Sequence, residues 1–386
     1  METRKTKSKK QFLLLTVVSL FLYACSSSVQ NVTTVKLDDA QIVVLDEAKV
    51  TEKKTVKLSD LVEDFQVIRF DNKDEAFFKA FWMYFSDNYI CIRQDGNPIK
   101  LFDKSGRYIG NVGNIGQGPG EYNHIYDILL DEKNQSIYVT PNVGDNVLHY
   151  DLTGKYVDKL RFGEKINKGR MFLSPDASTL SLVHLCFRDA GDKFTGANVQ
   201  LQNPDSVQYV YVDEIASNMK NQEGIQVGFN DEIWSYRNSA DFPFMMTHTD
   251  TLYHYNSQTN KIQAAFTMSM DPDKKGDSFF IFNEWPHHYF VTIVGEGGRS
   301  ILVDKEQPVG YEVEFVNDFM GYLEFYPLTQ DGYFYQNWEP AELRDALEET
   351  LASGNCPDDQ KEKLKAFMQT LHDNDNNLLF LGKLKQ

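Results

Sequence analysis

The sequence predicts an all-β fold, a six-bladed β-propeller with a small two-helix insertion near the C-terminus. Three observations lead to this prediction: a hairpin pattern that recurs after 48 residues, enough strand-like sequence for six such units, and strand-like segments near both ends that can share one blade. Repeats of about 40 to 50 residues with four short strands each are typical of propeller blades.

The recurring hairpin is the strongest of these signals. Residues 99–109 align with residues 147–157, and in both copies a strand ends in Asp-x-x-Gly, beginning at Asp103 and at Asp151. The Asp side chain can bond to the turn backbone, and the Gly accepts a positive φ angle. Each copy is therefore expected to form two antiparallel strands joined by a tight turn.

Strand-like sequence continues in further units along the chain. They occupy approximately residues 171–219, 242–255, 279–317 and 321–336, with the sixth blade expected to begin near Gly321. Because a ring must satisfy the edges of its first and last strands, the segment 65–70 is expected to pair with 378–384.

The segment 339–375 interrupts the strand pattern and is expected to be a helical insertion within the last blade. Apolar residues recur there at intervals of three and four in 341–351 and 358–371. Pro340 and Pro357 stand where the two helices would begin.

Residues 1–24 have the layout of an export signal, with five basic residues followed by an apolar run over 12–22. That run of 11 residues is shorter than the roughly 20 needed to span a bilayer. Leu22-Tyr23-Ala24-Cys25 resembles the bacterial lipobox, apart from Tyr23 where a small residue is usual. The resemblance implies lipid attachment at Cys25; an ordinary cleaved signal and an uncleaved anchor are the alternatives.

This interpretation divides the chain into a signal peptide (1–24), a lipid-anchored tether (25–54) and the propeller (55–386). By resemblance to known sorting rules, the absence of Asp after Cys25 favours the outer membrane, and the absence of an acidic cluster there favours its periplasmic face.

The charge of the chain limits the expected binding partners, and the cysteine content limits the expected disulfides. Removal of residues 1–24 changes the formal net charge from −17 to −21, and such a field repels nucleic acid. Beyond Cys25 the chain has Cys91, Cys186 and Cys356, an odd number at wide spacing, which implies no disulfide framework. The first two lie in strand-like runs and are expected to be buried thiols.

With these residues in view, the chain resembles the six-bladed β-propeller lipoproteins of Bacteroidetes, which are related in architecture to NHL-repeat and TolB-like propellers. The features that carry the resemblance are the lipobox, the Leu58-Ser-Asp-Leu-Val segment before a strand, the glycine loop 113–122 and the closing strand that ends at Lys385. The resemblance implies a fold and a place in the cell envelope, and no particular reaction.

The glycine loop is the first candidate site. It comprises Gly113, Gly116, Gly118, Gly120 and Glu121. Closely spaced backbone amides can cradle an anion. The loop lacks the Lys-Ser/Thr of a phosphate-binding P-loop, so a structural connection between blades is the simpler interpretation.

Aromatic and histidine residues form the second set of candidates. Trp82, Trp234, Trp285 and Trp338 could provide stacking surfaces for a sugar, and His287 and His288 could bind a metal or another ligand. Their positions within the repeats differ, and adjacent histidines on a strand point to opposite faces. Packing within the blades is therefore the competing interpretation.

No cofactor is expected, although Asp271–Asp277 vaguely resembles a Ca²⁺-binding loop. There, Lys275 stands where an oxygen ligand belongs. The Gly-x-Ser-x-Gly, His-Glu-x-x-His and Cys-x-x-Cys signatures do not occur in the sequence.

The sequence therefore favours a non-catalytic module that binds a glycan, a peptide or an envelope protein and is held to the membrane by its N-terminal lipid. The alternative is a carbohydrate-active hydrolase or lyase with its active site at a mouth of the propeller channel. Two carboxylates with a His or Arg at one mouth would favour the enzyme, whereas a filled channel would favour binding.

Overall fold

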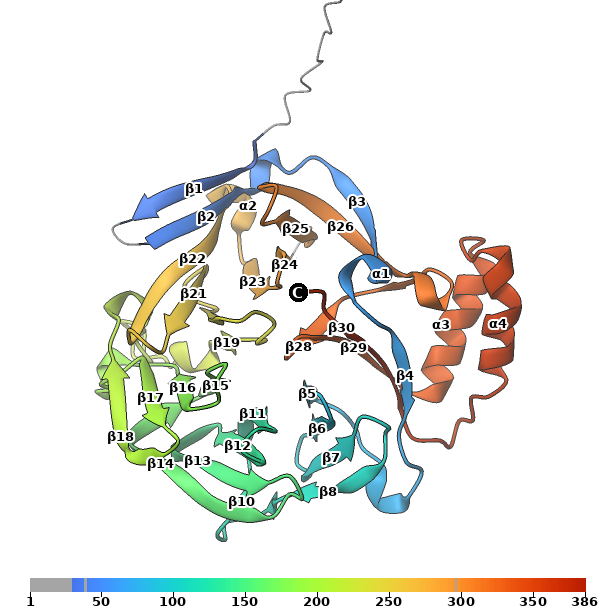
Figure 1. The fold of residues 1–386 in the computed structure, drawn as a ribbon. Coiled ribbons are helices and arrows are strands. Elements are labelled where there is room, and N and C mark those ends of the chain that lie inside the picture. Colours follow the sequence, from blue (N-terminus) through green and yellow to red (C-terminus); the bar gives the residue numbers. More distant parts are fainter. Residues whose placement is uncertain (1–29, 38–39, 296) are drawn as a thin grey trace, which may run out of the picture.

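The computed structural model describes residues 30–37, 40–295 and 297–386. Six β-sheets radiate from a central axis, which confirms the expected propeller (Figure 1). The first strand of each blade lies nearest the axis and the later strands follow outward. The signal peptide and Cys25 lie outside the described residues.

The blades follow one another round the ring in chain order. Blade one comprises β5 (Trp82–Phe85), β6 (Tyr89–Arg93), β7 (Ile99–Asp103) and β8 (Tyr108–Val112). Blade two comprises β11 (Ile125–Asp131), β12 (Ser136–Pro141), β13 (Val143–Asp151) and β14 (Tyr156–Asn167). Blade three comprises β15 (Arg170–Leu173), β16 (Thr179–Val183), β17 (Gly196–Gln200) and β18 (Asn203–Val210). Blade four comprises β19 (Ile233–Trp234), β20 (Phe242–Met246), β21 (Thr251–Asn256) and β22 (Lys261–Ser269). Blade five comprises β23 (Phe279–Glu284), β24 (His288–Val294), β25 (Ser300–Asp304) and β26 (Val309–Asn317). Blade six comprises β28 (Leu328–Gln330), β29 (Tyr333–Trp338), β30 (Leu378–Lys383) and β4 (Gln66–Arg69).

The recurring Asp-x-x-Gly turn joins the two outer strands in blades one and two. Asp103 Oδ1 accepts hydrogen bonds from the backbone N–H groups of Ser105 and Arg107 at 3.0 and 3.1 Å, and Asp151 makes the equivalent pair of bonds. Partial burial opposes the shift, but these hydrogen bonds lower the pKa of Asp103 below its ordinary value.

The glycine of each turn is required by contact with the preceding blade. A Cβ at Gly106 would lie 2.1 Å from the carbonyl oxygen of Arg69, and one at Gly154 would lie 2.1 Å from that of Asn111. Both glycines also have positive φ angles, +86° and +84°. The close packing of one blade on the next therefore explains why both copies of the 48-residue repeat have glycine at this position.

Ring closure occurs as the sequence predicts. β4 runs antiparallel to β30, with Arg69 opposite Leu378 and Gln66 opposite Leu381. Beyond β4, the N–H of Glu63 donates to Lys383 O at 2.8 Å. The outer strand of blade six thus comes from the N-terminal part of the chain, and the ring has no unpaired terminal blade.

The predicted start of the sixth blade is wrong. β27 (Leu323–Phe325) pairs with the end of β26 in blade five, and blade six begins at Leu328. Gly321, at φ +71°, reverses the chain so that β27 folds back on β26. Pro327 follows β27 and cannot donate a ladder hydrogen bond.

Part of the segment expected as a tether is folded. β1 (Val32–Leu37) and β2 (Ala40–Asp46) form a hairpin in which β2 pairs with β22, and β3 (Lys53–Lys57) pairs with β26. Figure 1 shows these strands along the outside of blades four and five. Val32 and Leu45 are buried, because the alternating apolar residues of this segment cover the outer strands.

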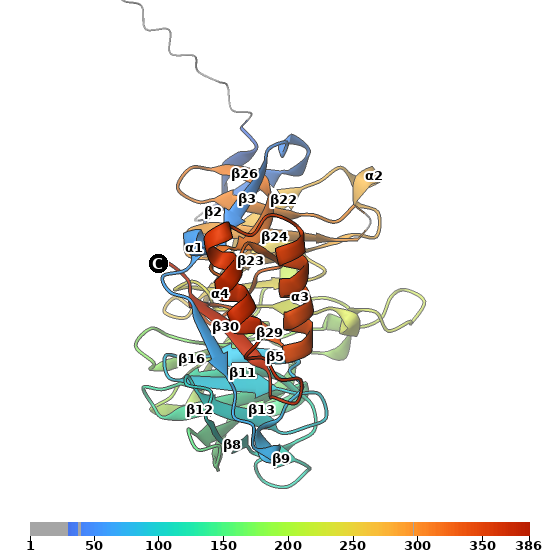
Figure 2. The same ribbon diagram turned by 90° about the vertical axis from the view of Figure 1, so that its right-hand side faces the viewer.

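The helical insertion is confirmed between β29 and β30. α3 (Pro340–Ala352) and α4 (Asp358–Met368) pack side by side on the outer rim of the ring (Figure 2). Leu343, Leu347 and Leu364 are buried against blades five and six. Two one-turn helices, α1 (Leu58–Leu61) and α2 (Pro272–Lys275), are the other α-helices of the described residues.

The expected burial of the cysteine thiols is also confirmed. Cys91 is buried in β6, Cys186 is buried just after β16, and Cys356 is buried in the connection between α3 and α4. All three are free thiols.

Candidate functional site

The glycine loop connects blade one to blade two and folds back on itself. Its ends form a short parallel pair, β9 (Asn114–Ile115) with β10 (Glu121–Tyr122). Gly116 N–H donates to Tyr122 O at 3.1 Å, which closes the loop. Gly113 and Gly120 have φ angles of +61° and +74°, a region that side-chain-bearing residues rarely adopt.

The middle glycines make room for a carboxylate. Glu121 Oε2 accepts the Gly118 N–H at 2.8 Å, and a Cβ at Gly116 would lie 2.0 Å from that same oxygen. The amide that could have cradled an external anion is therefore occupied by the chain's own carboxylate. This arrangement favours the structural interpretation of the glycines over the anion cradle.

Two buried tyrosines hold the loop in place. Tyr122 accepts the N–H of Ile99 at 2.9 Å and donates to the carbonyl of Val112, while Tyr150 donates to Gly120 O at 3.1 Å. Burial raises the pKa of both hydroxyls, so they remain protonated donors. These hydrogen bonds hold the loop rigidly, so that it can form the wall of a cavity.

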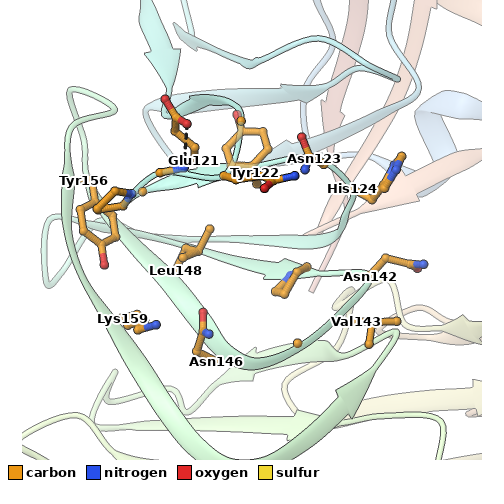
Figure 3. Close-up of a pocket in the computed structure, with 17 residues that line it drawn as sticks. Glu121, Tyr122, Asn123, His124, Asn142, Val143, Asn146, Leu148, Tyr156 and Lys159 are labelled. Atoms are coloured by element: carbon orange, nitrogen blue, oxygen red, sulfur yellow. Dashed lines mark hydrogen bonds between the residues drawn. The ribbon is translucent and has the colours of Figure 1, made fainter.

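This wall borders a cavity of about 780 Å³, within the usual size of a small-molecule site. Figure 3 shows its side chains in two rows, one from Glu121 to His124 and the other with Asn142, Val143, Asn146 and Lys159. Tyr156 closes one end of the cavity (Figure 3). We refer to this space as the glycine-loop cavity.

Most polar side chains of the glycine-loop cavity are not paired within the protein. Asn123, His124, Asn142 and Lys159 make no side-chain hydrogen bond or ion pair with any described residue. Asn123, His124 and Lys159 are exposed and Asn142 is half-buried. The sequence reasoning found Glu121 and the glycines but missed these four, which carry no motif.

The four tryptophans do not share a surface. Trp82 stacks on Tyr236 near the axis, with ring centroids 6.2 Å apart, whereas Trp234 donates to Thr247 Oγ1 at 3.1 Å. Trp285 is only 2% exposed and donates to Thr329 Oγ1 at 3.0 Å. Trp338 packs on Phe380 under the helical insertion. Each tryptophan therefore contacts a different neighbour within the fold.

His287 and His288 line a second cavity, of about 470 Å³, beside Trp285. His287 Nδ1 lies 3.2 Å from Glu306 Oε1, and His288 is half-buried opposite Asp304 on β25. Burial lowers the pKa of His288 below its ordinary value. In the part of the chain that the structure describes, no three His, Cys, Asp or Glu side chains are arranged to hold a metal ion.

The segment considered for Ca²⁺ forms a helix start instead. The side chain of Asp271 accepts the N–H of Asp273 at 3.0 Å and caps α2. Lys275 of the same turn pairs with Asp250. Asp271 and Lys275 are therefore engaged within the protein.

The sequence reasoning missed a buried charge network at the axis. Asp127 of β11 is completely buried, and its carboxylate lies 3.2 Å from Arg170 Nη1 and 2.8 Å from Arg237 Nη1. It also accepts the N–H of Met171 at 2.9 Å. The signal that could have revealed it is a lone carboxylate within the apolar run 125–130.

The network continues to blade six, where Arg237 Nε lies 2.6 Å from Asp331 Oδ1. Asp331 Oδ2 accepts the N–H of Phe85 in blade one at 2.9 Å. Burial raises the pKa of Asp331 although Arg237 opposes the shift. Arg237 and Asp331 border a cavity of about 450 Å³ at one axial mouth.

A family model described as a domain of unknown function, DUF4934, matches residues 40–383. The chain belongs to this family. No curated protein matches the DUF4934 chain.

One solved structure shares the fold of this DUF4934 chain. An exported protein of Bacteroides fragilis NCTC 9343 is 17% identical with a TM-score of 0.57, and the match covers 86% of this chain and 100% of that one. A DUF4221 family member of Bacteroides vulgatus ATCC 8482 is 11% identical with a TM-score of 0.45, covering 84% and 98%. The first likeness shows a shared fold alone.

Proposed function

We propose that this protein is an envelope binding module that takes a neutral glycan in the glycine-loop cavity. The observation that carries the proposal is a difference in side-chain pairing between the charge network at the axis and the glycine-loop cavity. The charged groups at the axis bond to one another, whereas Asn123, His124, Asn142 and Lys159 are left free by the described residues. Free amides and a tyrosine suit the hydroxyl groups and apolar ring faces of sugars.

The charge of the chain favours a neutral ligand. The formal net charge is −17, and Glu121 places a carboxylate in the cavity wall. Anionic ligands are repelled by such a field. Lys159 is the one cationic side chain among the residues that line the cavity.

The proposed location is the periplasmic face of the outer membrane, through lipid at Cys25. The lipobox resemblance supports the anchor, and the exported protein of Bacteroides fragilis supports passage out of the cytoplasm by analogy. Among residues 30–37, 40–295 and 297–386, no helix has the length and apolar character needed to cross a membrane. Several acyl chains on one cysteine would give a lasting attachment.

The binding test uses the protein from residue 26 onward on a glycan array, with Tyr156→Ala and Asn142→Ala as site variants. We expect retention of a neutral glycan by the parent protein and loss in both variants. Tyr211→Ala, at a half-exposed tyrosine outside the cavity, is the matched control and should bind normally. Equal binding by all four proteins, or no binding to any glycan, would refute the proposed site.

The anchor is tested separately. Cys25→Ser in the full-length chain should move the protein from the membrane fraction to the soluble fraction. Cys91→Ser, at a buried thiol, controls for loss of a sulfur and should remain with the membrane. Retention of the Cys25→Ser protein in the membrane would exclude lipid attachment there.

A carbohydrate-active hydrolase or lyase at the axial mouth is the second candidate. Arg237 and Asp331 border the cavity there, and Asp331 has a raised pKa, as a general acid requires. Turnover of a polysaccharide panel that disappears in Asp331→Asn and persists in Tyr156→Ala would support the enzyme. Absence of turnover by the parent protein would remove this candidate.

A further inference from the structure

We infer that the glycine-loop cavity is one half of a longer groove, and that its ligand is an oligosaccharide bound across two subsites rather than a single sugar. This inference rests on the proposed function. It starts from a smaller cavity, of about 210 Å³, on the other side of His124. The two cavities have Tyr122, Asn123, His124 and Asn142 in common, so they adjoin along that segment.

The shared segment is rigid. Asn142 N–H donates to His124 O at 2.9 Å, which ties the two rows of the glycine-loop cavity together at this end. Lys168 N–H in turn donates to Asn142 O at 2.8 Å. Because these bonds use backbone groups only, the side chains of Asn123, His124 and Asn142 remain available to both cavities.

The smaller cavity is also built from polar groups. Arg93 is fixed by a hydrogen bond from Nη1 to Tyr126 O at 3.0 Å and lies over the ring of Phe81 at 4.8 Å. Its other N–H groups make no hydrogen bond with a described residue. Asp95 and Asn97 complete the polar lining from the blade-one loop between β6 and β7. This chemistry again suits hydroxyl groups.

The shape of the groove favours a chain of sugars. Figure 3 shows Tyr156 at one end of the glycine-loop cavity and His124 with Asn142 at the other, next to the smaller cavity. A single sugar could contact one end only. An oligosaccharide could contact Tyr156, the shared segment and Arg93 together, and each additional contact would slow its dissociation.

The test is a titration with xylo-, malto- and manno-oligosaccharides of one to six sugars. For a series that binds, we expect affinity to rise at least about tenfold from monomer to hexamer. Asn97→Trp, which fills the smaller cavity at an exposed position, should reduce this gain to less than about threefold. Asn203→Trp, at an exposed position on blade three, should keep the full gain.

The outcomes separate this inference from the proposed function. Equal affinity for monomer and hexamer, or a full gain in Asn97→Trp, would overturn the two-subsite groove while leaving glycan binding intact. Tighter binding of oligogalacturonates than of every neutral series would overturn the neutral ligand. Failure of all series to bind would overturn the proposed function and the groove together.

Discussion

Asp127 of blade two accepts a hydrogen bond from Arg237 of blade four at 2.8 Å, although the two residues are 110 positions apart in the sequence. Arg237 also reaches Asp331 in blade six, so a single guanidinium connects three blades. The charges are largely removed from water, and they are compensated by one another and by backbone groups such as the Met171 N–H, which Asp127 accepts, and Ile128 O, to which Arg237 donates. The centre of the propeller therefore depends on each member of the network.

Replacement of Asp127 by Ala should be strongly destabilising. It leaves Arg170 and Arg237 buried without their shared carboxylate, a change that typically costs about 3 to 5 kcal/mol of unfolding free energy. Urea denaturation at constant m-value measures the loss. Asp205→Ala, at an exposed position, should stay within about 0.5 kcal/mol of the parent protein. A loss below about 1 kcal/mol in Asp127→Ala would contradict the role assigned to the network.

Two glycines with similar backbone angles allow the cost of a positive φ angle to be separated from the cost of a steric clash at Cβ. Gly154 and Gly354 have similar φ angles, +84° and +81°, but a Cβ at Gly154 meets Asn111 O and one at Gly354 meets nothing within 4 Å. Gly354→Ala should cost about 1 to 2 kcal/mol from the backbone angle alone. Gly154→Ala should cost roughly 1 to 3 kcal/mol more, because blade two must move away from blade one. Equal losses in denaturant midpoints would show that the close packing is unimportant.

Stability should depend on pH through His254 and Glu284, whose Nε2 and Oε2 atoms are 2.5 Å apart. Burial alone lowers the pKa of His254, but Glu284 and Asp241 raise it above the ordinary 6.5. Burial alone raises the pKa of Glu284, but His254 and Lys305 lower it below the ordinary 4.5. The histidine contribution is thus complete below 6.5 and is lost as pH rises through its folded pKa, and the glutamate contribution is lost as pH falls below 4.5.

His254→Gln tests this dependence. The difference in Tm between the parent protein and the variant should be largest at about pH 5.5 and should shrink as pH rises through the raised pKa of His254, above which the imidazole is neutral in both folded and unfolded chains. His149→Gln removes a histidine whose partner, Asp158, is 64% exposed and therefore screened by solvent; this variant is the control and should show the smaller change. A difference in Tm between the parent protein and His254→Gln that grows as pH rises would contradict the prediction.

The cysteine thiols should be unreactive in the folded protein. Burial raises the pKa of Cys186 to about 12 and raises the pKa values of Cys91 and Cys356 as well, so little thiolate is present at neutral pH. With the chain from residue 26 onward, a disulfide reagent such as DTNB should react slowly, and all three thiols should react at once in guanidinium chloride. Fast release of one equivalent from the native protein would show an exposed thiol.

The sequence alone could predict those features that arise from neighbouring residues. The Asp-x-x-Gly turns, the amphipathic helices and the pairing of 65–70 with the last strand follow from local patterns and from the need to close a ring, and the structure confirms them. The error at β27 came from assigning a strand to the blade that follows it in sequence, although Gly321 turns it back to the preceding blade.

The sequence determined the repeat, the closure of the ring and the glycine loop, because hydrogen bonding in turns and apolar periodicity act over a few residues. The tertiary structure decided the two sites. The Asp127 network joins positions 127, 170, 237 and 331, and the groove unites a loop of blade one with strands of blade two. Such side chains have no shared motif, since they meet only after the blades have packed into a ring.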